Sequence, residues 1–412
     1  MSVDVKMAWR NIWRNPRRTV LTISAIAFAS ILLVFMLSFQ FGFYETAINA
    51  SVRIHAGHLQ IQTEGYQDKQ SMRLVVPDPT ALGNLLENIE AVAAYSYRAN
   101  AFSLVSHDKR TYGVMVTGID PVSEASVSTL KNVISKGTYL TEKDGYQALV
   151  GKLLADNLRV VPGDELTLLG QARDGSVAAT VVTVKGIYKS GLDEFDRSSV
   201  HIPLKVFQDE YAMGESIHQV VTIGRSLTEV PEIKALIKSR LATQDPKTPL
   251  KVLDWEELMP GLRQAIELDL VSGLIFYLLL IIVVAFSILN TFLMAIFERT
   301  KEFGIMKAIG TTPGRLTKLL LIESLTITVV GILAGIILGI AVTYYFQVYG
   351  IDFSGSSELL GQFGISGRMY PRLSVFSILI GPGLVLAITI LAALYPALKV
   401  RALRPVRALT YG

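Results

Sequence analysis

The sequence predicts a membrane protein with four transmembrane α-helices and a large extracytoplasmic α+β domain inserted between the first and second spans. Three observations support this fold class. Half of the 412 residues are hydrophobic and the mean hydropathy is positive. Four stretches of more than twenty residues carry no charged side chain. Residues 45–268, between the first two stretches, alternate between strand-like and helix-like patterns.

The four uncharged stretches are long enough to cross a bilayer as helices. About 20 apolar residues, rising about 1.5 Å each, span a hydrocarbon core of roughly 30 Å. Buried helices of soluble proteins give shorter apolar runs of about 10–14 residues, so the membrane interpretation is favoured. The first stretch is too long for a signal peptide and should remain as an anchor. The uncharged stretches are residues 19–44, 270–297, 324–351 and 373–398. The predicted spans built on them are residues 19–44, 269–297, 318–351 and 373–398.

Lysine and arginine are concentrated on one side of these spans. The basic segments are residues 1–18, 298–317 and 399–412. The connector 352–372 contains only Arg368 and Arg372 as basic residues. Cytoplasmic loops carry an excess of lysine and arginine. We therefore expect both termini in the cytoplasm and residues 45–268 on the opposite side of the membrane.

The segment 1–18 has the pattern of an amphipathic helix lying on the membrane surface. Trp9, Ile12 and Trp13 share one arc at about 100° per residue, beside an arc of basic residues. Tryptophan prefers the headgroup layer. We expect these three residues to form a membrane-interface anchor, with Pro16 at the bend into the first span. A plain basic flank with incidental tryptophans is the alternative.

Local patterns within residues 45–268 predict a mixed α and β domain, or two small ones. β-Branched alternation predicts strands, and capped runs with one apolar face predict helices. The strand patterns are residues 58–63, 181–188 and 249–253, and the helix patterns are residues 78–92 and 229–241.

The third span carries Gly331, Gly335 and Gly339 at four-residue spacing. Glycines at this interval form a groove, so we expect this face to pack on a neighbouring span or subunit. Glu323 lies five residues after Lys318, about 7.5 Å along a helix. We expect its carboxylate to reach the interface or to cap a helix, and a transport pathway is the alternative.

No motif predicts catalysis or cofactor binding by this chain. The glycines at 113 and 118 have phosphate-loop spacing but lack the following lysine and hydroxyl. His55 and His58 would point to opposite faces of an extended segment, which is poor geometry for one metal ion. The absence of cysteine removes thiol chemistry. We assign the net charge of +4 to the basic flanks and expect no nucleic-acid partner.

The acidic residues Asp193, Glu194 and Asp196 are close in sequence. They could pair for acid and base catalysis. We favour the simpler interpretation, a solvated acidic turn between strands. Catalytic residues and metal ligands are therefore predicted to be absent.

The segment between spans two and three mixes charged and apolar side chains over about three helical turns, before Gly310 and Pro313 end the helix. A connector that only had to stay in water would not need those apolar residues. We expect an amphipathic coupling helix that docks on a cytoplasmic partner. Its candidate docking residues are Glu298, Lys301, Glu302, Phe303, Gly304, Ile305, Met306, Lys307, Ala308, Ile309 and Gly310.

Two stretches beside the predicted spans are distinctive: "ERTKEFGIMKAIGTTPGRL" (298–316), followed by "IESL", and "YPALKVRALRPVRAL" (395–409). They resemble the membrane signatures of the FtsX, MacB and LolC/LolE superfamily of ABC transporter permeases, the type VII or mechanotransmission group. Four stretches of the α+β domain resemble the LolC/LolE lipoprotein-releasing branch. They are "GHLQI" (57–61), "VTGIDP" (116–121), "GKLLADNLRVVPGDELTL" (151–168) and "GIYKSGLDEFD" (186–196).

The resemblance implies a permease of the bacterial inner membrane with a MacB-like periplasmic core and no catalysis of its own. A separate cytoplasmic ABC ATPase dimer would bind ATP and Mg, and the coupling helix would dock on it. A second permease subunit would complete a homodimer or a LolC/LolE-like heterodimer. The lipid-anchored substrate would be a lipoprotein, passed to a periplasmic lipoprotein carrier.

Other functions remain as alternatives. The chain could drive MacB-like efflux or FtsX-like regulation of a periplasmic partner. The absence of a fused ATPase and the size of the α+β domain make these less favoured. A membrane-anchored sensor, acting through the α+β domain alone, would not need a coupling helix.

Overall fold

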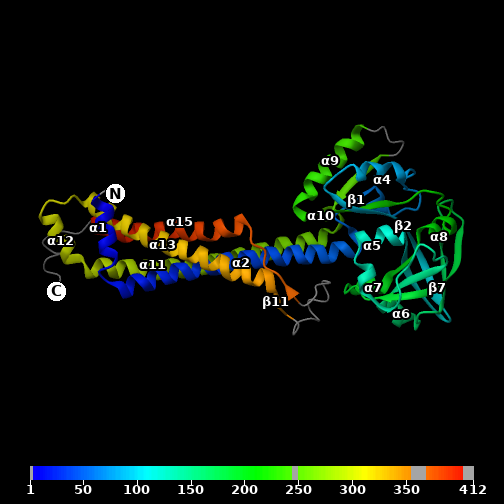
Figure 1. Cartoon of the computed structure of the whole chain (residues 1–412), viewed down its shortest axis with the longest axis horizontal. Coiled ribbons are helices and arrows are strands. Elements are labelled where there is room, and N and C mark those ends of the chain that lie inside the picture. Colours follow the sequence, from blue (N-terminus) through cyan, green and yellow to red (C-terminus); the bar gives the residue numbers. More distant parts are fainter. Residues whose placement is uncertain (1–2, 244–248, 354–367, 402–412) are drawn as a thin grey trace. The chain divides into compact units, whose positions relative to one another are not determined.

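The computed structural model describes residues 3–243, 249–353 and 368–401, and the chain divides into two compact units (Figure 1). The helical bundle is built from the described parts of Met1–Tyr44, Ile266–Asp352 and Arg368–Gly412, and the α+β domain is built on Glu45–Ala265. Most of the predicted C-terminal segment 399–412, and the middle of the connector 352–372, lie outside the described residues.

Within the described residues, the bundle contains four helices that are long and apolar enough to cross a membrane. Their core combines side chains from all four, including Ile26, Ile288, Ile327 and Val385. The helices lie side by side in Figure 1. The bundle helices are α1 (Val3–Ile12), α2 (Pro16–Ser51), α11 (Pro260–Glu298), α12 (Thr300–Ala308), α13 (Pro313–Tyr349) and α15 (Val375–Arg401).

The helices continue beyond the predicted spans, because an uncharged window marks only the part that crosses hydrocarbon. α2 begins at Pro16 and α13 at Pro313, and the fixed φ of proline suits the first helical position. The predicted surface helix 1–18 is therefore two pieces, α1 and the first residues of α2. A short ribbon, β11 (Ile351–Asp352) with β12 (Arg368–Met369), joins α13 to α15.

In the part of the α+β domain that the structure describes, ten strands form one sheet, with helices packed around it. The strands are β1 (Leu59–Thr63), β2 (Val92–His107), β3 (Arg110–Ile119), β4 (Ile134–Gly137), β5 (Gln147–Gly151), β6 (Glu165–Gln171), β7 (Val177–Tyr188), β8 (Ser199–Pro203), β9 (Gln219–Gly224) and β10 (Leu250–Asp254). The main helices are α3 (Tyr66–Lys69), α4 (Pro79–Glu87), α5 (Pro121–Val127), α6 (Lys152–Leu158), α7 (Asp193–Ser198), α8 (Leu204–Glu210), α9 (Val230–Thr243) and α10 (Trp255–Leu258), and a π-helical turn, η1, covers Val52–Ala56.

Strand β2 belongs to both halves of the domain. Its first part pairs with β9, which continues through β1 to β10, and α4 and α9 contribute to the core beside these strands. Its second part pairs with β6 and β3. The pairs β3–β8, β8–β5, β5–β7 and β7–β6 complete a closed ring of six strands, whose core is rich in valine. One long strand thus connects the two hydrophobic cores.

The predicted strands and helices of this domain correspond to β1, β7, β10, α4 and α9. Asp78 caps α4 by accepting a hydrogen bond from the backbone N of Ala81 at 3.1 Å. The extended conformation considered for the segment containing His55 is wrong. His55 lies in η1, and strand geometry begins only at Leu59.

Candidate functional site

The connection between α11 and α13 forms a short helix at one end of the bundle. α11 ends at Glu298, Arg299 is not helical, and α12 then begins at Thr300. Gly310 follows with φ of 101°, a left-handed value that favours glycine. The predicted coupling segment 298–317 therefore contains one helix, a turn and the first residues of α13.

One face of α12 is buried against the bundle. Phe303 has no exposed surface and packs with Ile296, Leu316 and Ala397, which belong to α11, α13 and α15. Burying one such side chain contributes about 1.5–3 kcal/mol. Gly304 is buried as well. The prediction that Phe303 and Gly304 dock on a partner is therefore wrong, because both face the bundle.

The opposite face of α12 carries apolar side chains that are exposed. Ile305 is 48% exposed and Ile309 is 80% exposed. Met306, Lys307 and Glu302 are half-buried. The exposed members of the predicted docking set are Glu298, Lys301, Ile305, Ala308, Ile309 and Gly310.

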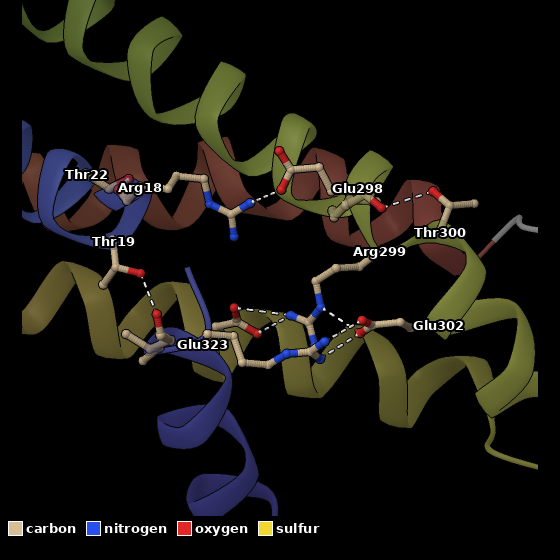
Figure 2. Close-up of polar contacts among 11 residues, drawn as sticks. Arg18, Thr19, Thr22, Glu298, Arg299, Thr300, Glu302 and Glu323 are labelled. Atoms are coloured by element: carbon tan, nitrogen blue, oxygen red, sulfur yellow. Dashed lines mark hydrogen bonds and ion pairs between the residues drawn. The ribbon is translucent and has the colours of Figure 1, made fainter. Parts of the chain in front are cut away.

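A chain of ion pairs connects α12 to the rest of the bundle (Figure 2). Arg14, between α1 and α2, donates two hydrogen bonds to the Glu302 carboxylate, at 3.0 and 2.7 Å. Arg299 Nε donates to Oε2 of the same glutamate at 3.2 Å. Nη1 of Arg299 also lies 3.1 Å from Oε2 of Glu323, which belongs to α13.

A second pair lies beside this chain. Arg18 Nη1 of α2 is 2.8 Å from Glu298 Oε2, at the end of α11 (Figure 2). Thr19 Oγ1 donates to the carbonyl of Ile12 at 2.5 Å and fixes α1 to the start of α2. We call the six charged residues the bundle-end network. They are Arg14, Arg18, Glu298, Arg299, Glu302 and Glu323.

The charged side chains of the bundle-end network differ in how much of their surface is exposed to solvent. The Arg14 side chain is 58% exposed, whereas the side chains of Arg299 and Glu323 are 12% and 9% exposed. The hydrogen bond from Arg14 and the contacts of Arg299 lower the pKa of Glu302. Glu323 was expected to reach the interface or cap a helix. Its carboxylate is buried and pairs with Arg299, and its position relative to the membrane interface stays a prediction.

The three spaced glycines of α13 lie against α2. A Cβ added at Gly335 would lie 2.5 Å from Ser30 Cβ, and one added at Gly331 would lie 2.9 Å from Ile26 Cβ. At Gly339 the corresponding distance, to Val34 Cβ, is 3.3 Å. Side chains at these positions would separate the two helices.

The predicted interface anchor is divided between two environments. Trp9 and Trp13 are about half exposed and stack edge to face, with ring centroids 6.1 Å apart. Ile12 is only 4% exposed and belongs to the bundle core. The two tryptophans therefore share an exposed surface, and Ile12 instead fixes α1 to the bundle.

In the α+β domain, the acidic group is not a solvated turn. Asp193, Glu194 and Asp196 lie on helix α7, and Asp196 is buried. Burial raises the pKa of Asp196, which accepts hydrogen bonds from the backbone and the hydroxyl of Ser190. Among the described residues, no group of three or more His, Asp or Glu side chains is placed to hold a metal ion.

A buried ion pair holds η1, the turn that follows α2, to the sheet. Arg98 of β2 and Glu124 of α5 are each 2% exposed, and their two hydrogen bonds measure 2.9 and 2.6 Å. Arg98 also donates to the carbonyl of His55. The backbone N of Thr129 donates to the carbonyl of Arg53 at 3.0 Å. These donors satisfy carbonyls that a helix end leaves unpaired, and we call this contact set the η1 junction.

Sequence reasoning missed both sets of ion pairs. The basic residues Arg14 and Arg18 were noticed only as an orientation signal. Their partners on α11 and α12 are about 280 residues away in sequence. Opposite charge was the available signal, but it does not specify which residues meet.

Taken together, four candidate spans, an inserted α+β domain and a charged helix between two spans define a membrane permease subunit. Two family models match the chain: the MacB-like periplasmic core domain over residues 19–240 and the FtsX-like permease C-terminal domain over residues 274–405. The chain therefore belongs to the MacB/FtsX-like family of ABC transporter permeases.

Curated relatives agree with this family. The chain is 23% identical to the lipoprotein-releasing system transmembrane protein LolC of Neisseria meningitidis, over 95% of this chain and 94% of that protein. It is 24% identical to LolE of Haemophilus influenzae, over 75% of each chain. It is 22% identical to the macrolide export ATP-binding/permease protein MacB of Nitrobacter winogradskyi, over 97% of this chain and 58% of that protein.

Proposed function

We propose that this chain is a permease subunit that couples ATP hydrolysis in a separate ATPase to the release of lipoproteins from the bacterial inner membrane. The observation that carries the coupling part is the construction of α12. Phe303 and the bundle-end network fix α12 to α11, α13 and the start of α2, while Ile305 and Ile309 remain exposed. A helix that is attached to the bundle on one face and exposes apolar side chains on the other can bind a partner and pass the movement of that partner to the bundle.

Lipoproteins are proposed as the substrate because the match to LolC extends over nearly the whole length of both chains. MacB-like efflux and FtsX-like regulation are the alternatives. The MacB relative matches over 58% of its length. In this proposal the ATPase is a separate subunit.

The proposed topology has both termini and α12 in the cytoplasm. The basic segments support it, because Arg14, Arg18, Arg299 and Lys301 all lie at the α12 end of the bundle. The match of residues 19–240 to a periplasmic core domain supports the same orientation.

The proposed complex contains an ABC ATPase dimer, which binds ATP and Mg, and a second permease subunit. The exposure of helix α11 supports a second subunit. Only 6% of the most apolar 18-residue stretch of this helix is buried within this chain. A periplasmic lipoprotein carrier would accept the released substrate. The simplest supporting observation is whether adjacent reading frames encode an ATPase, a permease or a carrier.

The first prediction tests the docking face of α12. The double substitution Ile305→Glu with Ile309→Glu should lower substrate-stimulated ATP hydrolysis at least tenfold in complexes reconstituted in proteoliposomes. Both side chains are exposed, so the bundle should keep its thermal stability. Leu169→Glu is the matched control, because Leu169 is an apolar residue 44% exposed on β6. Full substrate stimulation in the double variant would exclude α12 as the docking element.

The same proteoliposomes test the substrate. A triacylated lipoprotein should leave the membrane only when ATP and a soluble carrier are both present. ATP hydrolysis without any release would favour the alternative transport functions, and the coupling proposal would still stand.

A further inference from the structure

Helix α11 carries a polar side chain, Asn290, on the side that faces away from the bundle. Ile288 and Phe292, two residues before and after it, are 1% and 8% exposed and belong to the bundle core. Residues two apart on a helix point about 200° apart, so Asn290 faces away from that core. Its side chain is exposed, and it forms no hydrogen bond with the residues that the structure describes.

Asn290 lies well inside the span that α11 forms. Glu298, the first charged residue after it, is about 12 Å further along the helix, too far for the short side chain of asparagine to reach. Lipid chains offer no hydrogen-bond donor or acceptor, and an unpaired polar group in hydrocarbon is costly. The hydroxyl of the neighbouring Thr291 donates to the carbonyl of Ser287 in its own helix at 2.9 Å. The amide of Asn290 is instead placed to pair with a polar group on another membrane helix.

The apolar residues on the same face as Asn290 repeat with the spacing of a helix–helix seam. Steps of three and four residues connect them, as in the heptad pattern of a coiled coil. Contact with lipid would account for exposed apolar residues alone, but not for an amide in register with them. In two-stranded coiled coils, a single asparagine within such a seam fixes the register of the pair. The four apolar members, each more than half exposed, are Phe276, Leu279, Val283 and Phe286.

We propose that α11 pairs in the membrane with α11 of a second copy of this chain, and that the two Asn290 side chains hydrogen-bond to each other. An amide carries both donors and an acceptor, so it is complementary to an identical amide. In a two-fold symmetric dimer the same surface of each copy meets, which brings Asn290 opposite Asn290 at the axis. Two copies inserted in the same orientation make the helices parallel. This pairing rests on the proposed function for the need for a second permease subunit, and it specifies that subunit and its contact.

Cysteine cross-linking tests the seam, because the sequence contains no cysteine and each introduced thiol is the only one. The full-length chain is reconstituted alone in a large excess of lipid and oxidised with copper phenanthroline, and dimers are measured on non-reducing gels. Leu279→Cys should cross-link at least tenfold faster than Leu278→Cys, because a disulfide needs Cα atoms within about 7 Å. Leu278 is the matched control, because it is 54% exposed and Leu279 is 52% exposed, but it points about 100° away.

The role of Asn290 is tested by diluting the Leu279→Cys chain with lipid and measuring the dimer fraction after a brief oxidation. Asn290→Leu should weaken dimerisation about three- to thirtyfold, since hydrogen bonds between membrane helices are of modest strength. Asn290→Gln keeps the amide and should retain most of the affinity. Thr291→Val is the matched control, because that hydroxyl bonds within its own helix, and it should leave dimerisation unchanged.

Three results would overturn the proposal. They are equal cross-linking of Leu278→Cys and Leu279→Cys, unchanged dimerisation in Asn290→Leu, or cross-linking only to a different permease after co-expression, which would show that the partner is not a second copy. The assay contains neither ATPase nor lipoprotein. Cross-linked dimers of a chain whose complex releases no lipoprotein would therefore support the pairing and remove only the proposed substrate.

Discussion

The Arg14–Glu302 contact of the bundle and the Arg98–Glu124 contact of the α+β domain differ in their exposure to water. In the bundle-end network, the side chains of Arg14 and Glu302 are 58% and 38% exposed. In the η1 junction, those of Arg98 and Glu124 are each 2% exposed. Both contacts are bidentate, so geometry alone does not distinguish them.

The difference in burial gives the two contacts different mechanical properties. An exposed ion pair contributes about 0–1 kcal/mol and can separate and re-form easily. Removing one partner of a buried pair costs about 3–5 kcal/mol, because the other charge remains without compensation. The exposed part of the bundle-end network can therefore rearrange if α12 is displaced, as the proposed coupling requires, whereas the η1 junction should transmit a displacement of η1 to β2 without coming apart.

The largest expected effect is a difference between the two units in how their stability depends on pH. All five histidines lie within residues 45–268. Burial lowers the pKa of four of them, to about 4 for His55, His58 and His218 and about 3 for His201. Below pH 6.5 the unfolded chain binds protons that the folded domain does not, so stability falls as pH falls toward 4. Each histidine contributes up to about 1.4 kcal/mol per pH unit.

Denaturant unfolding between pH 7 and pH 5, followed through Trp255, measures this effect. Trp9→Phe with Trp13→Phe makes Trp255 the only tryptophan of the chain. The α+β domain should lose stability steeply over this interval, while far-ultraviolet circular dichroism should show the bundle helices persisting. A constant free energy of unfolding across this range would show that these histidines take up protons in the folded domain as readily as in the unfolded chain.

The next largest expected effect concerns the η1 junction. Burial alone would raise the pKa of Glu124, but the charge and hydrogen bonds of Arg98 outweigh burial and hold it below the usual value. Arg98→Met should therefore lower the free energy of unfolding of the α+β domain by about 3–5 kcal/mol. Adding Glu124→Leu should recover part of that loss, because no unpaired charge then remains.

Lys152→Met is the control for this prediction. It removes one partner of an exposed helical pair, Lys152 with Asp156, in the same domain. Its expected cost is below about 1 kcal/mol. Equal effects of Arg98→Met and Lys152→Met would contradict the assignment of Arg98 to a buried junction.

The sequence predicted the spans, the inserted domain and the helix between spans two and three, because hydropathy and local propensity are encoded over short distances. The sequence predicted less well which side chains of α12 are buried and which are exposed. Phe303 and Ile305 are equally apolar in the sequence, and only the packing of α11, α13 and α15 determines which of them is buried.

The ion pairs could not be predicted for a related reason. Glu323 was interpreted from its depth along one helix, but its environment depends on Arg299, 24 residues earlier. Arg98 stands in a strand pattern with no local feature that distinguishes it, and its partner lies on a separate helix. Contacts of this kind depend on topology, which local patterns do not specify.

The smallest expected effects concern the bundle-end network. They test whether the cost of removing a charge rises with the burial of its partner. Arg14→Gln removes an exposed partner, so its cost to thermal stability in nanodiscs should stay below about 1 kcal/mol. Arg299→Gln should cost more, because Glu323 would remain buried without its cation. Adding Glu323→Gln to Arg299→Gln should restore most of the difference. If Arg14→Gln were as costly as Arg299→Gln, the exposed part of the network would also be rigid, and its contrast with the η1 junction would disappear.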